Sequence, residues 1–340
     1  MVSFVRPKYT KSKIKAAGKR SAKLAPTLED SIVVENFRAS HAYVLNTFQM
    51  NARRHSAGVE RTVGQRLKRR NTIIDKLRRE PSMPLHAMQD IAGCRLIFQS
   101  QKDLYDVRSS LRDARFSHKR LNDADKYDYI KNPKSTGYRG VHDIYEYTVM
   151  KEPGSAWNGL RAEIQFRTQP QHAWATAVEV ADLITSSRIK FNDAKQNYLR
   201  YFQLSSEIIA RTSEGQRSCC GELTDKSLRK EFISAEKRLG ILGTLNNLRQ
   251  IDSKRQRFKK NMLLIFKFDA EESERLETKV FENINQAIEA YDRLEKAYGD
   301  LADIVLVRGE TEENIRDAFR NYFSDARAFV DLVNDGLKNL

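Results

Sequence analysis

Two short runs, Asp90–Phe98 (DIAGCRLIF) and Leu160–Thr168 (LRAEIQFRT), decide the fold of this chain of 340 residues. The first run is apolar from Ile91 onward and polar residues follow it, which favours a buried strand. The second run alternates: one face carries Leu160, Ala162, Ile164 and Phe166, and the other carries Arg161, Glu163, Gln165 and Arg167. One carboxylate, Asp90, therefore lies just before the first predicted strand, Ile91–Phe98, and another, Glu163, lies in the middle of the second strand, beside cations.

The flanking sequence predicts helices and further strands. Thr10 is expected to cap a short helix over 11–23, and Thr27-x-x-Asp30 reads as a capping box that opens a long amphipathic helix. Other expected elements are helices over 64–80, over 103–115 and from about 170 to 250, and a strand Val141–Val149 that pairs antiparallel with 160–168. Near the C-terminus, the strand-like runs Met262–Phe268 and Asp303–Arg308, each followed by a helical pattern, predict a small α/β unit.

The formal charge of +15 is concentrated at the N-terminus, where residues 1–80 hold 19 Lys and Arg against 6 Asp and Glu. Such a block attracts nucleotide triphosphates or RNA, or it is simply a solvated basic surface. No apolar run approaches the roughly 20 residues of a membrane span. The three cysteines show no zinc spacing, and the adjacent pair Cys219 and Cys220 is poorly placed to bridge. We therefore expect a cytoplasmic protein without a membrane partner.

A cationic stripe is predicted on the helix over 64–80. Lys68, Thr72 and Lys76 recur every four residues, and Arg66 and Arg69 extend the stripe, so these groups could neutralise a triphosphate. The alternative is a solvated basic face. No Walker loop is present, so phosphates must be held by side chains and metal.

Asp90 and Glu163 are the candidate metal ligands. A carboxylate at the edge of a buried strand can hold Mg²⁺ together with phosphate oxygens and water, although Asp90 could also be a turn or cap residue. Glu163 suits a metal ligand or a general base, and a cross-strand salt-bridge ladder would give the same pattern. Between the two carboxylates, the loop 127–142 combines Lys131, Lys134, Arg139 and Tyr138, a combination that suits a stacked base with clamped phosphates.

Taken in order, these motifs resemble the synthetase domain of the RelA/SpoT alarmone family. The resemblance rests on Arg66-x-Lys68, Thr72, Lys76, Asp90-Ile-Ala-Gly-Cys-Arg95, Asp128-Tyr-Ile, Gly137-Tyr138-Arg139, His142, Glu163-Ile-Gln165-x-Arg167 and Gln171-His172-Ala-Trp174. It implies an α+β, nucleotidyltransferase-like mixed β-sheet flanked by helices, and a catalytic domain over 59–185. Residues 1–58 would then form a basic helical N-terminal extension, 186–255 a helical region, and 256–340 an accessory or regulatory domain.

The same resemblance implies the reaction and the roles of the residues. Pyrophosphate would pass from ATP to the 3′-hydroxyl of GDP or GTP, with Asp90 and Glu163 as Mg²⁺ ligands and catalytic groups. ATP would be bound by Arg66, Lys68, Thr72, Lys76 and Arg95, and the acceptor by Lys134, Tyr138, His142, Gln165 and Arg167. Departures from the family pattern include Tyr127 where Lys is frequent and Thr72 where Ser is usual. No room for a hydrolase domain precedes residue 60, so we expect synthesis without hydrolysis.

Two other functions fit the sequence. Some members of the superfamily are toxins that pyrophosphorylate the 3′ end of tRNA, and the basic N-terminal block agrees with an RNA acceptor. A catalytically idle nucleotide or RNA sensor is the other, against which both carboxylates and Tyr138 argue. The C-terminal 80 residues could bind an antitoxin or a regulatory protein, or form a homo-oligomer.

Overall fold

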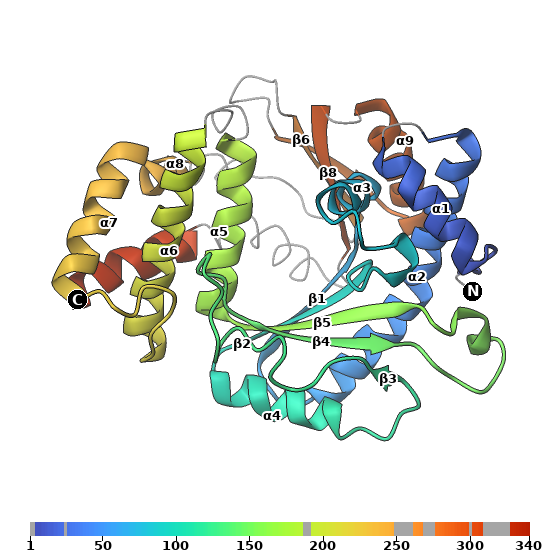
Figure 1. Ribbon diagram of the computed structural model, residues 1–340, viewed down its shortest axis with the longest axis horizontal. Coiled ribbons are helices and arrows are strands. Elements are labelled where there is room, and N and C mark those ends of the chain that lie inside the picture. Colours follow the sequence, from blue (N-terminus) through green and yellow to red (C-terminus); the bar gives the residue numbers. More distant parts are fainter. Residues whose placement is uncertain are drawn as a thin grey trace. The chain divides into compact units, whose positions relative to one another are not determined.

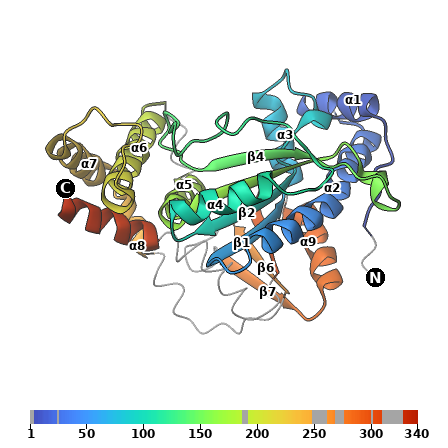
Figure 2. The same ribbon diagram turned by 90° about the horizontal axis from the view of Figure 1, so that it is seen from below.

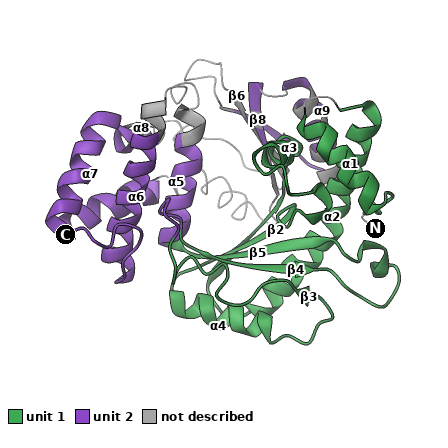
Figure 3. Ribbon diagram, viewed as in Figure 1, with its two compact units in different colours: residues 1–133, 139–169 green, residues 134–138, 170–340 purple. Residues whose placement is uncertain are grey.

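The protein is described from a computed structural model that covers residues 4–23, 26–185, 192–247, 261–267, 276–298, 301–308 and 327–340. The chain divides into two compact units, residues 1–133 with 139–169, and residues 134–138 with 170–340 (Figure 3). Within the described ranges, no helix combines the length and the apolar composition that a membrane crossing requires.

The first unit is built on a five-stranded mixed sheet in the order β1-β2-β5-β4-β3. Its strands are β1 (Arg61–Leu67), β2 (Ala92–Phe98), β3 (Lys119–Arg120), β4 (Val141–Glu146) and β5 (Arg161–Thr168). β2 and β5 run parallel, whereas β1 with β2, β4 with β5 and β3 with β4 are antiparallel. The predicted mixed sheet and the predicted antiparallel pairing of the two later strands are confirmed.

The apolar face of this sheet packs against two helices, α2 (Leu28–His55) and α4 (Gln101–Arg112) (Figures 1 and 2). Leu96, Ile164 and Phe166 from the strands are buried in one cluster with Phe48 of α2 and Leu104 of α4. Burial of apolar area stabilises the fold by about 25 cal/mol per Å². Because side chains alternate along a strand, this packing directs Glu163 and its polar companions to the opposite face.

Helix caps fix the N-terminal elements where the sequence predicted them. α1 (Lys11–Ala22) begins after Thr10, whose hydroxyl accepts a hydrogen bond from the Lys13 amide, and α2 begins with the capping box of Thr27 and Asp30. Arg20 donates to Asp30 from Nε and Nη2, at 2.9 and 2.6 Å. The N-terminal basic segment is thus helical, and part of its charge joins α1 to α2.

The predicted helix over 64–80 is wrong in its first third. Residues Arg61–Leu67 form β1, and the helix α3 spans only Arg70–Arg79. The ladder from β1 to β2 continues through the Lys68 amide, which donates to the Ile91 carbonyl at 2.8 Å. Pairing with β2 satisfies the backbone groups of this stretch, and that tertiary gain outweighs its helical pattern. Only Thr72 and Lys76 therefore share a helix face.

The second unit is mainly helical. Its helices are α5 (Gln169–Thr185), α6 (Asn192–Glu214), α7 (Asp225–Leu239) and α8 (Ile241–Asn247), which confirms the helices expected after residue 170. The residues over 327–339 are also helical, and Phe329, Val330 and Val333 are buried in the same cluster as residues of α5 to α8. The C-terminal helix is thus part of the helical core.

A small antiparallel sheet in the order β7-β6-β8 completes this unit. It consists of β6 (Asn261–Lys267), β7 (Leu276–Phe281) and β8 (Ala302–Arg308), with α9 (Ile284–Tyr298) between β7 and β8. The predicted order missed β7, because the sequence LETKVF of this edge strand alternates charged and apolar residues too briefly to stand out. Phe268 and the helix predicted after Arg308 lie outside the described residues.

Candidate active site

Asp90, placed immediately before β2, is the centre of a cluster of cations. The ammonium groups of Lys68 and Lys76 each lie 3.0 Å from Asp90 Oδ2. Asp90 Oδ1 is buried and has no hydrogen-bond partner. One carboxylate oxygen accepts hydrogen bonds from two lysines, and the other accepts none. Since neither oxygen bonds a backbone amide, Asp90 is neither a helix cap nor a turn residue.

Rigid elements hold both lysines in place. Lys68 ends the β1 ladder, and its carbonyl accepts a hydrogen bond of 2.8 Å from Nε of Arg38, a buried residue of α2. Lys76 projects from α3, one turn after Thr72, and the other side of that helix is anchored by the buried Ile73 and Leu77. The cationic groups are therefore preorganised around the carboxylate.

Glu163 lies in the middle of β5 on the polar face of the sheet. Its directly paired neighbours are Gly93 of β2 and Ile144 of β4, neither of which carries a charge. On the same face, Arg161 lies 3.8 Å from Glu146 across β5 and β4. Glu163 Oε1 lies 2.7 Å from Nδ1 of His142, and Oε2 accepts 2.6 Å from the amide nitrogen of Gln165. Both carboxylate oxygens are thus held in a fixed orientation.

The environment keeps Glu163 ionised. Burial by itself raises the pKa of this carboxyl, but the hydrogen bond and charge of His142, the hydrogen bond from Gln165 and the charge of Lys76 outweigh burial and lower the pKa to about 2. Lys76 therefore acts on both carboxylates, through an ion pair with Asp90 and through its field on Glu163. The two acids face a common cation.

The strand register assembles the remaining polar residues of the first unit. Arg95, Gln165 and His142 are directly paired across β2, β5 and β4, and side chains paired in this way share one face. Nε of Arg95 and Nη2 of Arg167 lie 3.4 and 3.3 Å from Oε1 of Gln165. Arg66, exposed on β1, is paired with Gly93, which is in turn paired with Glu163, so Arg66 and Glu163 lie on the same face of the sheet. The first unit therefore contains ten of the twelve predicted site residues, namely Arg66, Lys68, Thr72, Lys76, Asp90, Arg95, His142, Glu163, Gln165 and Arg167.

Lys134 and Tyr138, the other two predicted residues, belong to the second unit. The Lys134 ammonium lies 5.4 Å from the centroid of the Tyr138 ring, and that ring packs edge-on to Trp174 at 6.5 Å. Gly137 between them has φ of +92°, and an added Cβ would lie 3.0 Å from Cβ of Ser206 in α6. The structure therefore pairs Lys134 with Tyr138 and packs the loop between them against α6 of the second unit.

Sequence reasoning assigned no role to a buried network under β4. Arg108 of α4 donates to both carboxylate oxygens of Asp143, at 3.0 and 2.8 Å, and lies 3.5 Å from Asp128. Asp128 also accepts from the hydroxyl of Tyr105 and from the amide of Ile130. The motif Asp128-Tyr-Ile and the dipeptide His142-Asp143 are the sequence signals that could have pointed to this network. Asp128 and Asp143 both serve to hold the backbone next to His142.

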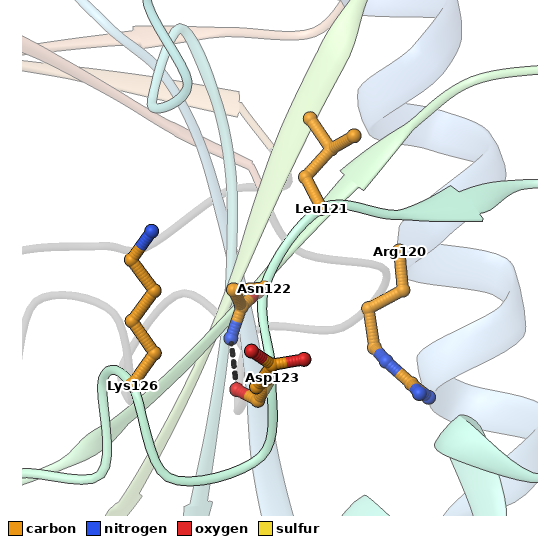
Figure 4. A pocket seen from close by; sticks show the side chains of 5 residues that line it. All are labelled: Arg120, Leu121, Asn122, Asp123 and Lys126. Atoms are coloured by element: carbon orange, nitrogen blue, oxygen red, sulfur yellow. Dashed lines mark hydrogen bonds between the residues drawn. The ribbon is translucent and has the colours of Figure 1, made fainter.

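A polar surface hollow of about 390 Å³ lies next to this network. Arg120, Leu121, Asn122, Asp123 and Lys126 line it (Figure 4). Asn122 points its amide at the Asp123 carbonyl, 2.9 Å away, and its Oδ1 accepts 2.7 Å from the amide of Ile144. Asn122 thus supports β4 from behind, and none of the predicted site residues lines the hollow.

The donor set is suited to one hard cation. Mg²⁺ takes one or two protein carboxylates and completes its octahedron with water and phosphate oxygens. The unpartnered, buried Oδ1 of Asp90 is an oxygen of the kind that such an ion engages, and Glu163 is anionic. Among the described residues there is no cluster of three or more His, Cys, Asp or Glu that would form a complete protein cage. The residues fit a metal that a nucleotide brings with it.

The fold is an α+β domain, and its mixed sheet carries two carboxylates and an array of cations on one face. Enzymes of phosphate transfer require such a site, so fold and site together indicate this class of protein. Residues 65–184 match the region found in RelA/SpoT proteins. GTP pyrophosphokinase YjbM of Bacillus subtilis is 32% identical over 157 residues, which are 45% of this chain and 69% of YjbM. The chain therefore belongs to the RelA/SpoT family.

A further relative and a solved structure come from the same organism. GTP pyrophosphokinase YwaC of Bacillus subtilis is 34% identical over 117 residues, which are 33% of this chain and 52% of YwaC. The crystal structure of small alarmone synthetase 1 from Bacillus subtilis, bound to its product pppGpp, aligns with a TM-score of 0.45 and 26% identity over 53% of this chain and 93% of that chain.

Proposed function

We propose that this protein transfers pyrophosphate from ATP to the 3′-hydroxyl of GDP or GTP and so makes a guanosine tetra- or pentaphosphate. Its curated relatives are named GTP pyrophosphokinases. The observation that carries the proposal is the cluster in which Lys68 and Lys76 share Asp90 Oδ2 while Oδ1 stays without a partner. A triphosphate with its Mg²⁺ would supply both the anion that the cations need and the cation that Oδ1 needs.

In this proposal Asp90 and Glu163 hold Mg²⁺, which when bound would neutralise charge on the phosphates. Lys68, Lys76, Arg66, Arg95 and Thr72 bind the donor. The acceptor 3′-oxygen attacks the β-phosphorus while its hydroxyl proton passes to water, the bond from that phosphorus to the bridging α–β oxygen breaks, and AMP leaves. Positioning and charge neutralisation carry such transfers, with little covalent chemistry for the protein.

Glu163 serves better as a ligand than as a base. A carboxylate whose pKa is about 2 holds a proton weakly at neutral pH, so general-base catalysis by Glu163 would contribute little. His142, bonded to Oε1, keeps the carboxylate in one orientation. Lys134 and Tyr138 are the proposed acceptor contacts, because a cation beside a half-buried tyrosine ring suits a guanine base with its phosphates.

Transfer of label from [γ-³²P]ATP tests the proposal. With GDP, GTP or bulk tRNA offered separately, we expect label in a guanine nucleotide, and no label in any acceptor would contradict the proposal. Label in RNA would instead favour the tRNA acceptor. Asp90→Asn and Glu163→Gln should each reduce transfer at least about 100-fold with unchanged circular dichroism, because each removes a charge that the metal needs. Asp75→Asn on the exposed side of α3 is the matched control and should keep full activity.

A further inference from the structure

Two adjacent cysteines lie next to the loop that carries Tyr138, and no other part of the site uses them. Cys219 and Cys220 follow α6, and their Sγ atoms are 3.9 Å apart. Cys220 is buried, whereas Cys219 is partly exposed. A guanidinium nitrogen of Arg200 lies 3.3 Å from Cys220 Sγ. A cation at this distance favours the thiolate, which is the reactive form of cysteine.

The charges around the pair agree with this geometry. The hydrogen bond from Cys219 lowers the pKa of Cys220, burial raises it, and the positive charge of Arg200 lowers it further, with a net downward shift. By contrast, burial raises the pKa of Cys94, the third cysteine, to about 12. Within the pair, Cys220 is therefore the activated thiol, because the hydrogen bond with Cys220 and burial raise the pKa of Cys219. Cys94 is inert.

The turn that holds the dithiol is bonded to the Tyr138 loop by two routes over α6. In the first, the hydroxyls of Ser218 and Ser206 lie 3.1 Å apart, and Ser206 donates 2.6 Å to the Gly137 carbonyl. In the second, Cys219 Sγ lies 3.6 Å from the backbone carbonyl of Gln203. The side-chain amide of Gln203 donates a hydrogen bond of 2.7 Å to the backbone carbonyl of Ser135. A movement of the turn therefore reaches residues 135–137 directly.

A buried carboxylate holds the turn in its present shape. Glu207 Oε2 accepts from the amides of Ser218 and Cys220, at 2.7 and 3.0 Å, and Glu207 is fully buried. A disulfide requires the two sulfurs to come about 2 Å closer together, to an S–S length of ~2.05 Å. Closing the small ring between neighbouring residues would turn the peptide between them and break the hydrogen bonds that these two amides donate to Glu207. Such a strained bridge is a poor structural link but an easily reduced one.

We propose that Cys219 and Cys220 form a reversible dithiol–disulfide site whose oxidation by a peroxide loosens the Lys134–Tyr138 loop and weakens acceptor binding. The effect on the acceptor rests on the proposed function, whereas the oxidation and the loosening do not.

The oxidation balances with hydrogen peroxide as the oxidant. The Cys220 thiolate attacks one peroxide oxygen, so that an S–O bond forms, the O–O bond breaks and the hydroxide released takes a proton to become water. The Cys219 sulfur then attacks the sulfenic sulfur, so that an S–S bond forms and the S–O bond breaks, and the departing hydroxide takes the Cys219 proton to become water. One peroxide thus converts two thiols to one disulfide and two waters.

The experiment uses the full chain, treated with hydrogen peroxide and then with an alkylating agent. Mass spectrometry should find the peptide with both cysteines unalkylated and lighter by about 2 Da, and dithiothreitol should reverse the change. Hydrogen exchange at the amides of Gly137, Ser218 and Cys220 should accelerate roughly tenfold in the oxidised chain. Cys219→Ser should abolish both responses, and Cys94→Ala, the control, should keep both.

Failure of the proposal is distinct from failure of the proposed function. Two alkylatable thiols after peroxide treatment, or a disulfide with unchanged exchange at Gly137, would overturn the proposal, and neither readout needs enzymatic activity. If the reduced chain does transfer pyrophosphate, oxidation should raise KM for GDP roughly fivefold and leave KM for ATP unchanged. An unchanged KM for GDP would overturn the link to the acceptor.

Discussion

At the scale of single residues, the site depends on two acids in different surroundings. Asp90 neutralises two lysines through one oxygen, and Glu163 is held by the neutral amide of Gln165 and by His142. Because Lys76 acts on both, a change at either acid alters the charge balance at the other. The site is therefore a single electrostatic unit that spans β2 and β5.

The depressed pKa of Glu163 predicts how stability depends on pH. A carboxyl whose pKa is lower in the folded than in the unfolded protein stabilises the fold above the unfolded pKa, near 4.5, and loses that contribution as the pH falls toward about 2. Urea unfolding between pH 6 and pH 3 should therefore show a steeper loss of unfolding free energy for the wild type than for Glu163→Gln. Parallel curves for the two proteins would contradict the prediction.

At the scale of elements, helix α4 is fastened to β4 by Arg108. This guanidinium neutralises two fully buried acids, Asp143 and Asp128. Arg108→Met would leave Asp143 with Arg112 as its partner and would take the nearby guanidinium from Asp128, and removing one member of a buried ion pair costs roughly 3–5 kcal/mol. Chemical denaturation should measure a loss of that order, together with weaker transfer because β4 also carries His142.

A matched control lies on the same helix. Lys102 pairs with Asp106 at 2.7 Å, but both side chains are largely exposed. Lys102→Met should change the free energy of unfolding by no more than about 0.5 kcal/mol. Equal losses for the two variants would show that Arg108 acts only through general packing of α4.

At the scale of the whole molecule, the C-terminal residues cannot be removed as one block. The helix over 327–339 packs on α6 so closely that a Cβ added at Gly336 would lie 2.5 Å from Ile208. Truncation after residue 255 removes Phe329 and should therefore expose the apolar residues that it covers in the helical core. The shortened chain should unfold at a lower temperature and aggregate. Thermal unfolding with light scattering measures both effects.

A second design separates the small sheet from this helix. Replacing residues 256–326 with a flexible linker removes β6, β7, α9 and β8 but keeps the helix over 327–339. This chain should remain soluble and show any regulatory effect of the small sheet as a change in activity. A truncated chain that unfolds at the wild-type temperature would contradict the assigned packing.

The sequence by itself determined the strand that carries Glu163, the strand that follows Asp90, the helix caps and the family. Alternation placed Glu163 opposite the apolar face, and Thr10 and Thr27 located the starts of α1 and α2, because periodicity and capping are local properties. The order of the motifs over 66–174 carries the RelA/SpoT resemblance without reference to any tertiary contact.

Only the tertiary structure decided which residues meet. The edge of β2 made a strand of Arg61–Leu67, although that segment has a helical pattern, since ladder hydrogen bonds come from a partner remote in sequence. Local pattern likewise could not reveal that Lys68 and Lys76 share one oxygen of Asp90, that Arg108 neutralises two buried acids, or that the dithiol is bonded to the Tyr138 loop. Each of these contacts joins segments that are separated along the chain, and packing rather than propensity brings them together.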